Sequence, residues 1–425
     1  MVINRRLTAE ECAPIHYAFS PLGRLPTELL QNVFLYVTEP STLLLVCKYW
    51  QRVAVKFSPL WETVIFDPAK HTARTAAFLL RQLESGRYRP INLDIAGWPR
   101  WVEHKTLRQV VGHCLKNLQH TQQLSINLNI EGSAVAFGEL VPMQDAPELR
   151  DFRLRCEDPW MDDYISVELP LLKATKSLKH VEFWRFPLEK SPVSLVNLHS
   201  LAIHRITRIS STAINDLIKR NPGLKSFSVV YSSPGWPWGA VEFPVLERFT
   251  LSFVPVVFPL IIGIFKAPKL QHLYLTAPFN WLIVHYILEP LPLANLRTLH
   301  LTSTDRPLFL GTGLHPVIEK CTSLVNLTLC DPSCDPQPII TCLRSILSLS
   351  SDGSLKLPHL SILGLPSWMT NSAVAFGELL KLKEWGSIVL YGEGLGKLEL
   401  RDLKWRYRRL PPIVWKAYPP EMQPY

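Results

Sequence analysis

The densest pattern of apolar residues at helical spacing occupies residues 25–67. Pro26 suits a first helical turn there, and Glu28 adds an anion near the positive end of the helix dipole. Apolar residues then recur three and four positions apart: Leu29, Leu30, Val33, Phe34 and Val37. A second segment of this kind covers 43–55, and a third apolar patch covers 60–66. We predict three short helical pieces, whose apolar surface is too large for so small a domain to bury alone.

A different pattern begins near Tyr88. An apolar residue is followed by a second one three positions later and by a third two positions after that. This motif occurs eleven times, from Pro90-x-x-Leu93-x-Ile95 to Leu360-x-x-Leu363-x-Leu365, with first positions 20 to 36 residues apart. Such a period is typical of a solenoid, in which each unit buries its apolar face against its neighbours.

The motif predicts a short strand, because two alternating side chains face one way and the earlier residue packs beneath them. Stacked units would form a parallel sheet, with return segments between strands that are helical over 106–118, 211–219 and 314–320. Several units begin with a Pro-x-Leu phrase, which predicts a turn just before the strand. The octapeptide SAVAFGEL occurs at 133–140 and again at 372–379. We interpret both copies as helical return segments.

The first region resembles an F-box. The resemblance rests on Leu25-Pro26-x-Glu28-Leu29-Leu30, Val46-Cys47-Lys48-x-Trp50 and Leu60-Trp61, taken in that order. It implies a small three-helix domain that docks on an adaptor of the Skp family. Carried over by position, the adaptor-binding residues are Leu25, Pro26, Leu29, Leu30, Val33, Phe34, Leu44, Val46, Cys47, Trp50, Leu60 and Trp61, some of which must instead form the core of the domain.

The repeated unit resembles the leucine-rich repeat, in a degenerate form. The asparagine that this family places three positions after the last aliphatic residue of the strand occurs only as Asn129. The two resemblances together imply an α/β fold class: an N-terminal three-helix F-box followed by a leucine-rich-repeat solenoid with a parallel sheet. We expect five segments: an extension (1–20), the F-box (21–67), a helical linker (68–87), the solenoid (88–385), and a basic C-terminal cap and tail (386–425).

Composition narrows the class of protein. Apolar residues make up 47% of the chain and charged residues 19%, as expected for a folded protein with a large core. No secretory signal is visible in residues 1–14, and the apolar stretch 253–265 is too short to span a bilayer, since about 20 residues are needed. We therefore expect an intracellular protein, in the cytoplasm or nucleus, that does not bind membranes. Its eight cysteines lack paired spacings, which favours reduced thiols.

The net charge of +9 raises the question of nucleic-acid binding. The excess is spread along the chain, except between 397 and 425, where seven basic residues stand against three acidic ones. This distribution favours a solvated basic tail over a phosphate-binding site.

Motifs for phosphate loops, zinc proteases and serine hydrolases are missing from the sequence, as is any C-x-x-C pair. Cys330 and Cys334, with Cys321 and Cys342 nearby, have atypical spacing for zinc, and the strand pattern would bury Cys330. We therefore expect no catalytic residues, no metal site and no cofactor.

Two loops that follow strands carry aromatic residues suited to anchoring a partner. One contains Tyr231, Trp236 and Trp238, and the other, which is also acidic, contains Trp160 and Tyr164. These five residues are our candidates for substrate binding, although Trp236 and Trp238 could equally cap the core between two repeats.

The combination of F-box and repeats resembles the substrate receptor of a cullin-RING (SCF-type) ubiquitin ligase. It implies a non-catalytic subunit that holds an unidentified protein substrate and reaches the cullin-RING ligase through the Skp-family adaptor. The alternative is an adaptor-independent scaffold, whose helical domain caps the solenoid.

Overall fold

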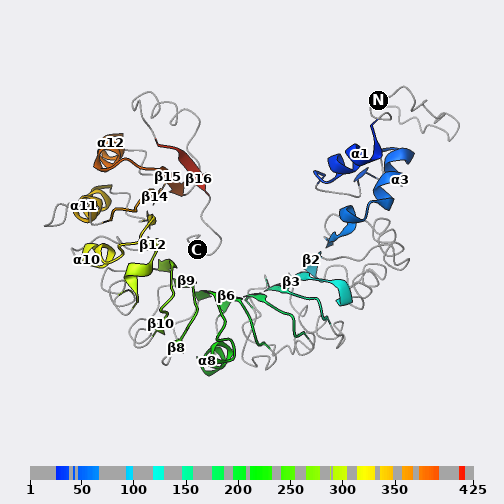
Figure 1. Cartoon of the computed structure of the whole chain (residues 1–425), viewed down its shortest axis with the longest axis horizontal. Coiled ribbons are helices and arrows are strands. Elements are labelled where there is room, and N and C mark those ends of the chain that lie inside the picture. Colours follow the sequence, from blue (N-terminus) through cyan, green and yellow to red (C-terminus); the bar gives the residue numbers. More distant parts are fainter. Residues whose placement is uncertain are drawn as a thin grey trace, which may run out of the picture.

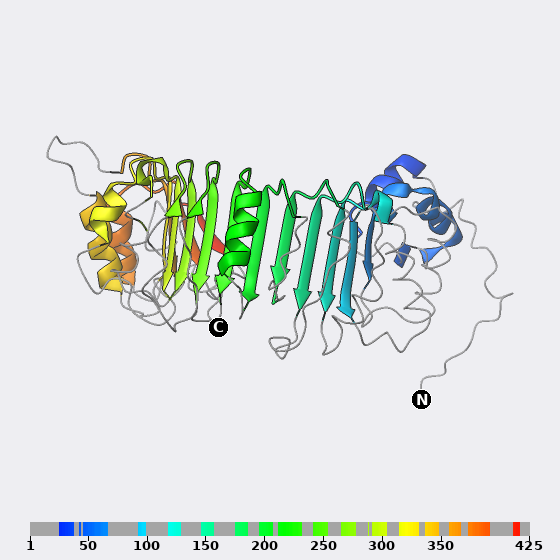
Figure 2. The same cartoon turned by 90° about the horizontal axis from the view of Figure 1, so that it is seen from below.

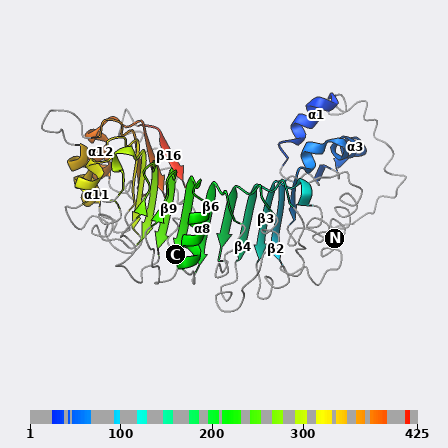
Figure 3. The same ribbon diagram turned by 60° about the horizontal axis from the view of Figure 1, so that its bottom comes forward.

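Parallel strands form one continuous sheet that curves into an arc, with helices α1 and α3 at one end and α11 and α12 at the other (Figures 1 and 3). The computed structural model describes residues 25–37, 42–43, 46–66, 92–98, 118–128, 146–156, 175–185, 195–206, 211–231, 241–253, 265–277, 288, 291–303, 314–330, 336–347, 357–366, 373–391 and 411–416. Among the described helices, none is long and apolar enough to cross a membrane.

The sheet has fourteen strands, and their order in the sheet is their order in the chain (Figure 2). Every neighbouring pair is parallel. The strands are β1 Thr63–Phe66, β2 Asn92–Trp98, β3 Gln123–Leu128, β4 Asp151–Cys156, β5 His180–Trp184, β6 Ser200–Ile206, β7 Ser226–Tyr231, β9 Arg248–Phe253, β11 His272–Ala277, β12 Thr298–Ser303, β13 Asn326–Cys330, β14 Ile362–Pro366, β15 Ser387–Tyr391 and β16 Ile413–Lys416. A separate parallel pair joins β8 (Val241–Glu242) to β10 (Phe265–Lys266).

Short helices occupy the outer side of the arc and both of its ends (Figure 1). The helices are α1 Thr27–Phe34, α3 Lys48–Lys56, α8 Ser211–Arg220, α10 His315–Glu319, α11 Pro336–Leu347 and α12 Ala373–Leu382. Three short 3-10 segments are η3 Ser58–Trp61, η4 Leu118–His120 and η6 Leu293–Asn295. The predicted helical returns at 211–219 and 314–320 are confirmed as α8 and α10. Residues 373–379 of the second SAVAFGEL copy lie in α12, as predicted. The predicted helical linker (68–87), residues 106–117 and the first copy lie outside the described residues.

The repeated motif sets the register of the sheet. Its two alternating positions are buried and paired strand to strand, from Leu93 and Ile95 in β2 to Ile388 and Leu390 in β15. They share one core with residues of α8, α10, α11 and α12, so the buried face of the sheet is the outer one. The remaining strand positions line the inner side of the arc, because side chains alternate across a strand. The predicted strand pattern is confirmed.

The predicted turns are also confirmed. In each of four Pro-x-Leu phrases the leucine N–H donates to the carbonyl three residues earlier, which closes a β-turn with proline at its second position. These hydrogen bonds are Leu149 to Ala146 (3.2 Å), Leu224 to Asn221 (3.1 Å), Leu270 to Ala267 (3.2 Å) and Leu360 to Leu357 (3.4 Å). The turn places the leucine side chain in the core just before the strand starts.

The sheet extends beyond the predicted repeats at both ends. Strand β1 lies inside the predicted F-box and pairs with β2, so the third apolar patch of that region is a 3-10 turn followed by a strand. At the other end, β15 and β16 lie in the segment predicted as a cap and tail. The motif spacing continues there as Trp385-x-x-Ile388-x-Leu390, and Trp385 is buried, with its indole N–H donating to the Leu379 carbonyl at 3.2 Å. This unit was not among the eleven predicted, and its first position is a tryptophan.

A buried asparagine, Asn221, satisfies backbone groups between two neighbouring units of the sheet. The Asn221 side-chain oxygen accepts the N–H of Leu198 at 2.8 Å, and its amide nitrogen donates to the carbonyls of Leu195 at 2.9 Å and Leu217 at 2.7 Å. Asn221 therefore ties the end of α8 to the chain that enters β6, and satisfies buried backbone groups that would otherwise cost about 1–3 kcal/mol each.

Candidate functional site

Helix α1 presents an apolar face to solvent. Leu29 and Val33 lie four positions apart on one face of α1, and Tyr36 lies in the turn that follows the helix. The three residues expose 51%, 48% and 88% of their surface. We call these three residues the α1 face. Seven large apolar side chains are exposed in the described residues, and five of them are Leu29, Val33, Leu35, Tyr36 and Val46. Exposed apolar surface is therefore concentrated around this helix.

The opposite side of α1 closes a small core. Leu30 and Phe34 are fully buried, and the Phe34 ring lies 5.1 Å from that of Trp50 on α3, tilted by 59°. Aromatic pairs with this separation and tilt contribute about 0.5–1.5 kcal/mol beyond the area that they bury. Because α1 is already packed on its buried side, its exposed leucine and valine are available for another molecule.

Cys47 starts the second helix of this region. Its backbone is extended, and its sulfur accepts the N–H of Trp50 at 3.4 Å, so the side chain caps α3. The hydroxyls of Thr27 and Tyr49 lie 3.4 Å apart and join α1 to α3. Val46, immediately before the cap, is exposed on the same small domain.

The structure separates the predicted adaptor-binding residues into an outer and an inner group. Leu29, Val33, Val46 and Pro26 are exposed, and Leu25, Cys47 and Trp50 are half-buried. Leu30, Phe34 and Leu60 are buried in the domain core, where they support the surface and do not form it. Leu44 and the side chain of Trp61 lie outside the described residues.

Two exposed residues that directly follow α1, Leu35 and Tyr36, were not among the predicted contacts. The N–H of Tyr36 donates to the Val33 carbonyl at 3.1 Å, so Tyr36 lies in the turn next to Val33. The i+7 step from Leu29 was the signal that pointed to it. Val37, which the apolar pattern included, is instead half-buried against the core.

The inner side of the arc carries a second surface, made of charged and aromatic side chains on β4, β5 and β6. Glu182 accepts from Arg155 at 3.0 Å and lies 3.7 Å from the Nε atom of Arg153. The Arg155 guanidinium lies 5.6 Å from the centre of the Trp184 ring, which in turn lies 5.0 Å from the ring of His204. One carboxylate therefore faces two guanidinium groups, so this cluster retains one positive charge.

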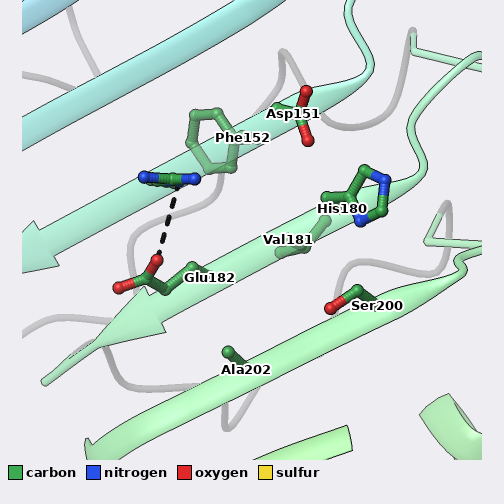
Figure 4. A pocket seen from close by; sticks show the side chains of 8 residues that line it. Asp151, Phe152, His180, Val181, Glu182, Ser200 and Ala202 are labelled. Atoms are coloured by element: carbon green, nitrogen blue, oxygen red, sulfur yellow. Dashed lines mark ion pairs between the residues drawn. The ribbon is translucent and has the colours of Figure 1, made fainter. Parts of the chain in front are cut away.

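A hollow of about 230 Å³ opens beside this cluster. Asp151, His180 and Glu182 point into it from β4 and β5, while small side chains, Ser200 and Ala202, form its side on β6 (Figure 4). The hollow exists because β6 carries short side chains where β4 and β5 carry long ones. Its lining includes acidic side chains, Asp151 and Glu182, and basic ones, Arg153 and His180.

Further along the arc the inner face is more tightly packed. His300 is buried, its Nε2 atom lies 2.9 Å from the Thr302 hydroxyl, and its ring lies 5.9 Å from that of Tyr274. Burial lowers the pKa of His300 to about 3. The imidazole is therefore neutral at physiological pH, which suits a structural role in the sheet.

The predicted substrate-binding aromatics cannot be placed on this surface. Trp160, Tyr164, Trp236 and Trp238 lie outside the described residues, and of Tyr231 only the backbone is described, at the end of β7. Trp184, like Tyr274, is an aromatic residue that the described strands do place on the inner face, and its position in the repeat, two residues after Glu182, was the signal available for it.

The cysteines considered as zinc ligands lie in different elements and have different surroundings. Cys330 is buried in β13, as the strand pattern predicted. Cys321 is a buried free thiol whose S–H donates to the Val317 carbonyl at 3.6 Å, and burial raises its pKa to about 12. A thiol that remains protonated is a poor metal ligand, since zinc binds the thiolate. Cys334 lies outside the described residues.

Comparison with known protein families identifies the first domain. An F-box-like family model matches residues 22–67, the region that contains the α1 face and α3. F-box domains generally bind Skp-family adaptors. A search of curated proteins finds no match.

Proposed function

We propose that this protein is the substrate-recognition subunit of an SCF-type ubiquitin ligase. The F-box binds a Skp-family adaptor, and the sheet, as a leucine-rich-repeat solenoid, binds a protein substrate. The protein itself is not an enzyme: catalysis belongs to the cullin-RING subunits, and this chain contributes proximity by tethering the substrate. This role places it inside the cell, in the cytoplasm or nucleus.

The observation that carries the proposal is the α1 face within the F-box-like domain. Exposed apolar surface that is concentrated on one element is typical of a protein-binding site. Leu29 and Val33 project from a helix whose buried side is held by Phe34 and Trp50, so the surface is already ordered before a partner arrives. A preordered surface loses little conformational entropy on binding.

The sheet supports the second half of the proposal. Its strands are formed by repeats of one unit and follow one another in chain order. In the described part of the chain, polar and charged residues line the inner side of the sheet, where a covering layer would otherwise pack. Parallel sheets are usually covered on both faces. An inner face built from residues such as Arg153, Glu182 and Ser200 is instead suited to a polar partner.

The experiment replaces Leu29 and Val33 together by glutamate in the full chain. Two carboxylates in an apolar interface would be desolvated without a partner, so capture of a purified Skp-family adaptor should weaken by at least about 100-fold. The matched control is Val196→Glu, because Val196 has a similar exposure of 40% but lies away from this helix. Circular dichroism and thermal unfolding should be the same for both variants.

Adaptor capture that survives in the L29E/V33E variant would overturn the proposal. It would favour the alternative, an adaptor-independent scaffold in which the helical domain caps the sheet. One observation supports this alternative: β1, inside the F-box-like domain, pairs with β2 over Thr63–Phe66 and so continues the sheet. In that case the L29E/V33E variant would retain its partners, and deleting residues 22–61 would make the sheet insoluble.

A further inference from the structure

Four basic residues stand in a row at the edge of the sheet where β4, β5, β6 and β7 begin. Each occupies the position just before its strand: Arg150, Lys179, His199 and Lys225. Each of the first three carbonyls accepts the backbone N–H of the next member, Arg150 from Lys179 at 2.8 Å, Lys179 from His199 at 2.8 Å, and His199 from Lys225 at 2.9 Å. We call these four residues the basic row.

The backbone fixes the spacing of this row. Neighbouring strands lie about 4.8 Å apart, so the four positions extend over roughly 14 Å. Gln122 occupies the equivalent position before the row and Glu247 the one after it, joined by the same kind of hydrogen bond. Arg150 and Lys179 are like charges at equivalent positions of neighbouring strands, and such pairs are destabilising.

Within the described residues, little offsets these charges. Lys225 lies 3.8 Å from Glu247, and the Lys179 ammonium donates to the Asn197 carbonyl at 3.4 Å. The pKa of His199 is lowered, first by partial desolvation and then by the positive charges of Lys179, His180 and Lys225. The lowered pKa favours the neutral form of His199, so the positive charges of the row are those of Arg150, Lys179 and Lys225, which an external anion would attract.

The hollow on the inner face adjoins the basic row. Asp151, His180 and Ser200, which help to line the hollow, directly follow three members of the row in sequence. Arg153, on the same wall, shares Glu182 with Arg155. A segment bound along the row could therefore place a side chain in the hollow, where Asp151 would accept a hydrogen bond from a donor.

We propose that the basic row binds an acidic segment of the protein substrate, with anionic side chains at alternate positions. This inference rests on the proposed function, because it names the chemistry of the substrate. An extended peptide advances about 3.4 Å per residue and places every second side chain on one face, so three anionic side chains at alternate positions match a row of about 14 Å. Glutamate, aspartate and phosphoserine share the required negative charge.

A peptide fits this site better than a nucleic acid. The row ends at Glu247, and the inner face beside it holds Asp151 and Glu182. A nucleic acid that continued in any of these directions would bring its phosphates against carboxylates. A short acidic peptide would instead end before these carboxylates, or would place a basic residue against them.

The test measures fluorescence anisotropy of labelled peptides with the full chain. The probes are one peptide with three glutamates at alternate positions, its glutamine counterpart, its phosphoserine counterpart, and a single-stranded RNA of equal charge. We expect the two anionic peptides to bind and the glutamine peptide not to bind. The comparison of glutamate with phosphoserine separates the two sources of negative charge.

The variant K179E/K225E should weaken binding of the anionic peptides by at least tenfold, because it reverses two charges at the centre and end of the row. The control K320E/K381E makes the same change in net charge at exposed positions on the far arm and should leave binding unchanged. Equal binding by both variants, binding of the glutamine peptide, or tighter binding of the RNA would overturn the inference. Adaptor capture, measured with the same proteins, reports on the proposed function separately, since K179E/K225E leaves the α1 face intact.

Discussion

The α1 face and the basic row are both surfaces without a partner in the free chain, but they are built from opposite chemistry. The α1 face exposes leucine, valine and tyrosine over a closed core, so its gain on binding comes from removing apolar surface from water, about 25 cal/mol per Å². The basic row exposes charges held apart by a rigid backbone ladder, so its gain is electrostatic. The adaptor and the substrate of the proposed function should therefore respond independently to solution conditions.

Salt separates the two surfaces. Exposed charges more than about 8 Å apart are largely screened at 0.15 M ionic strength, whereas hydrophobic contacts are not. Binding at the basic row should therefore weaken as salt is added, while adaptor binding should persist. A partner could then be washed from the sheet while the adaptor stays attached.

The largest effect that we predict compares neighbouring residues of α1. Phe34→Ala should destabilise the F-box by about 3–5 kcal/mol, because it leaves a cavity beside Trp50 in a small core. Val33→Ala should leave the stability within about 0.5 kcal/mol and weaken only adaptor capture. Hydrogen exchange of α1 and α3 measures the first effect and a pull-down the second. Equal effects of the two substitutions on exchange would mean that the inner and outer sides of α1 are not distinct.

The second prediction concerns Asn221, whose buried side chain holds neighbouring segments of the sheet together, as Phe34 holds α1 against α3. Asn221→Ala removes three buried hydrogen bonds and should lower the free energy of unfolding by about 2–4 kcal/mol. The control is Asn295→Ala, an exposed turn residue with one hydrogen bond, at 3.3 Å, to the Pro268 carbonyl, and its effect should stay near 0.5 kcal/mol or less. Urea unfolding measures both, and a small effect at Asn221 would contradict its assigned role.

The third prediction is a pH dependence that belongs to the sheet. The pKa of His300 is about 3 in the folded chain, against an ordinary value near 6.5, so below pH 6.5 the unfolded chain takes up a proton that the folded chain does not. Stability from this residue is complete above pH 6.5 and is lost as the pH falls toward 3.

Between pH 6.5 and pH 5 the loss from His300 should approach about 2 kcal/mol, since one pKa unit corresponds to about 1.4 kcal/mol. Thermal unfolding of His300→Gln should show a shallower slope over this range, whatever the variant's stability at pH 7.5. An unchanged slope would show that His300 is not the group responsible. Adaptor capture by the α1 face should not follow this slope while the sheet remains folded.

Much of the fold could be predicted because the motif carries its own geometry. Two alternating apolar residues specify a strand and its buried face, and Pro-x-Leu specifies the turn before it, as Leu149 and Leu224 confirm. The ends of the sheet were harder to predict. The units at β1 and β15 have tryptophan at the first position, and whether a strand forms there depends on the neighbour that it pairs with.

The candidate sites were predicted unevenly for a similar reason. Helical periodicity selects Leu29 and Val33 together with Leu30 and Phe34, but only packing against α3 decides which of them remain exposed. For the basic row, Arg150, Lys179, His199 and Lys225 lie 20 to 29 residues apart, so no local pattern connects them.

The sequence by itself determined the units of this protein, because strands, turns and amphipathic helices depend on residues within about ten positions of each other. Tertiary structure alone decided which surfaces the units leave open. Stacking in register brings one position of each unit to the same edge, at a spacing set by backbone hydrogen bonds. That spacing is what turns four separate basic residues into one row.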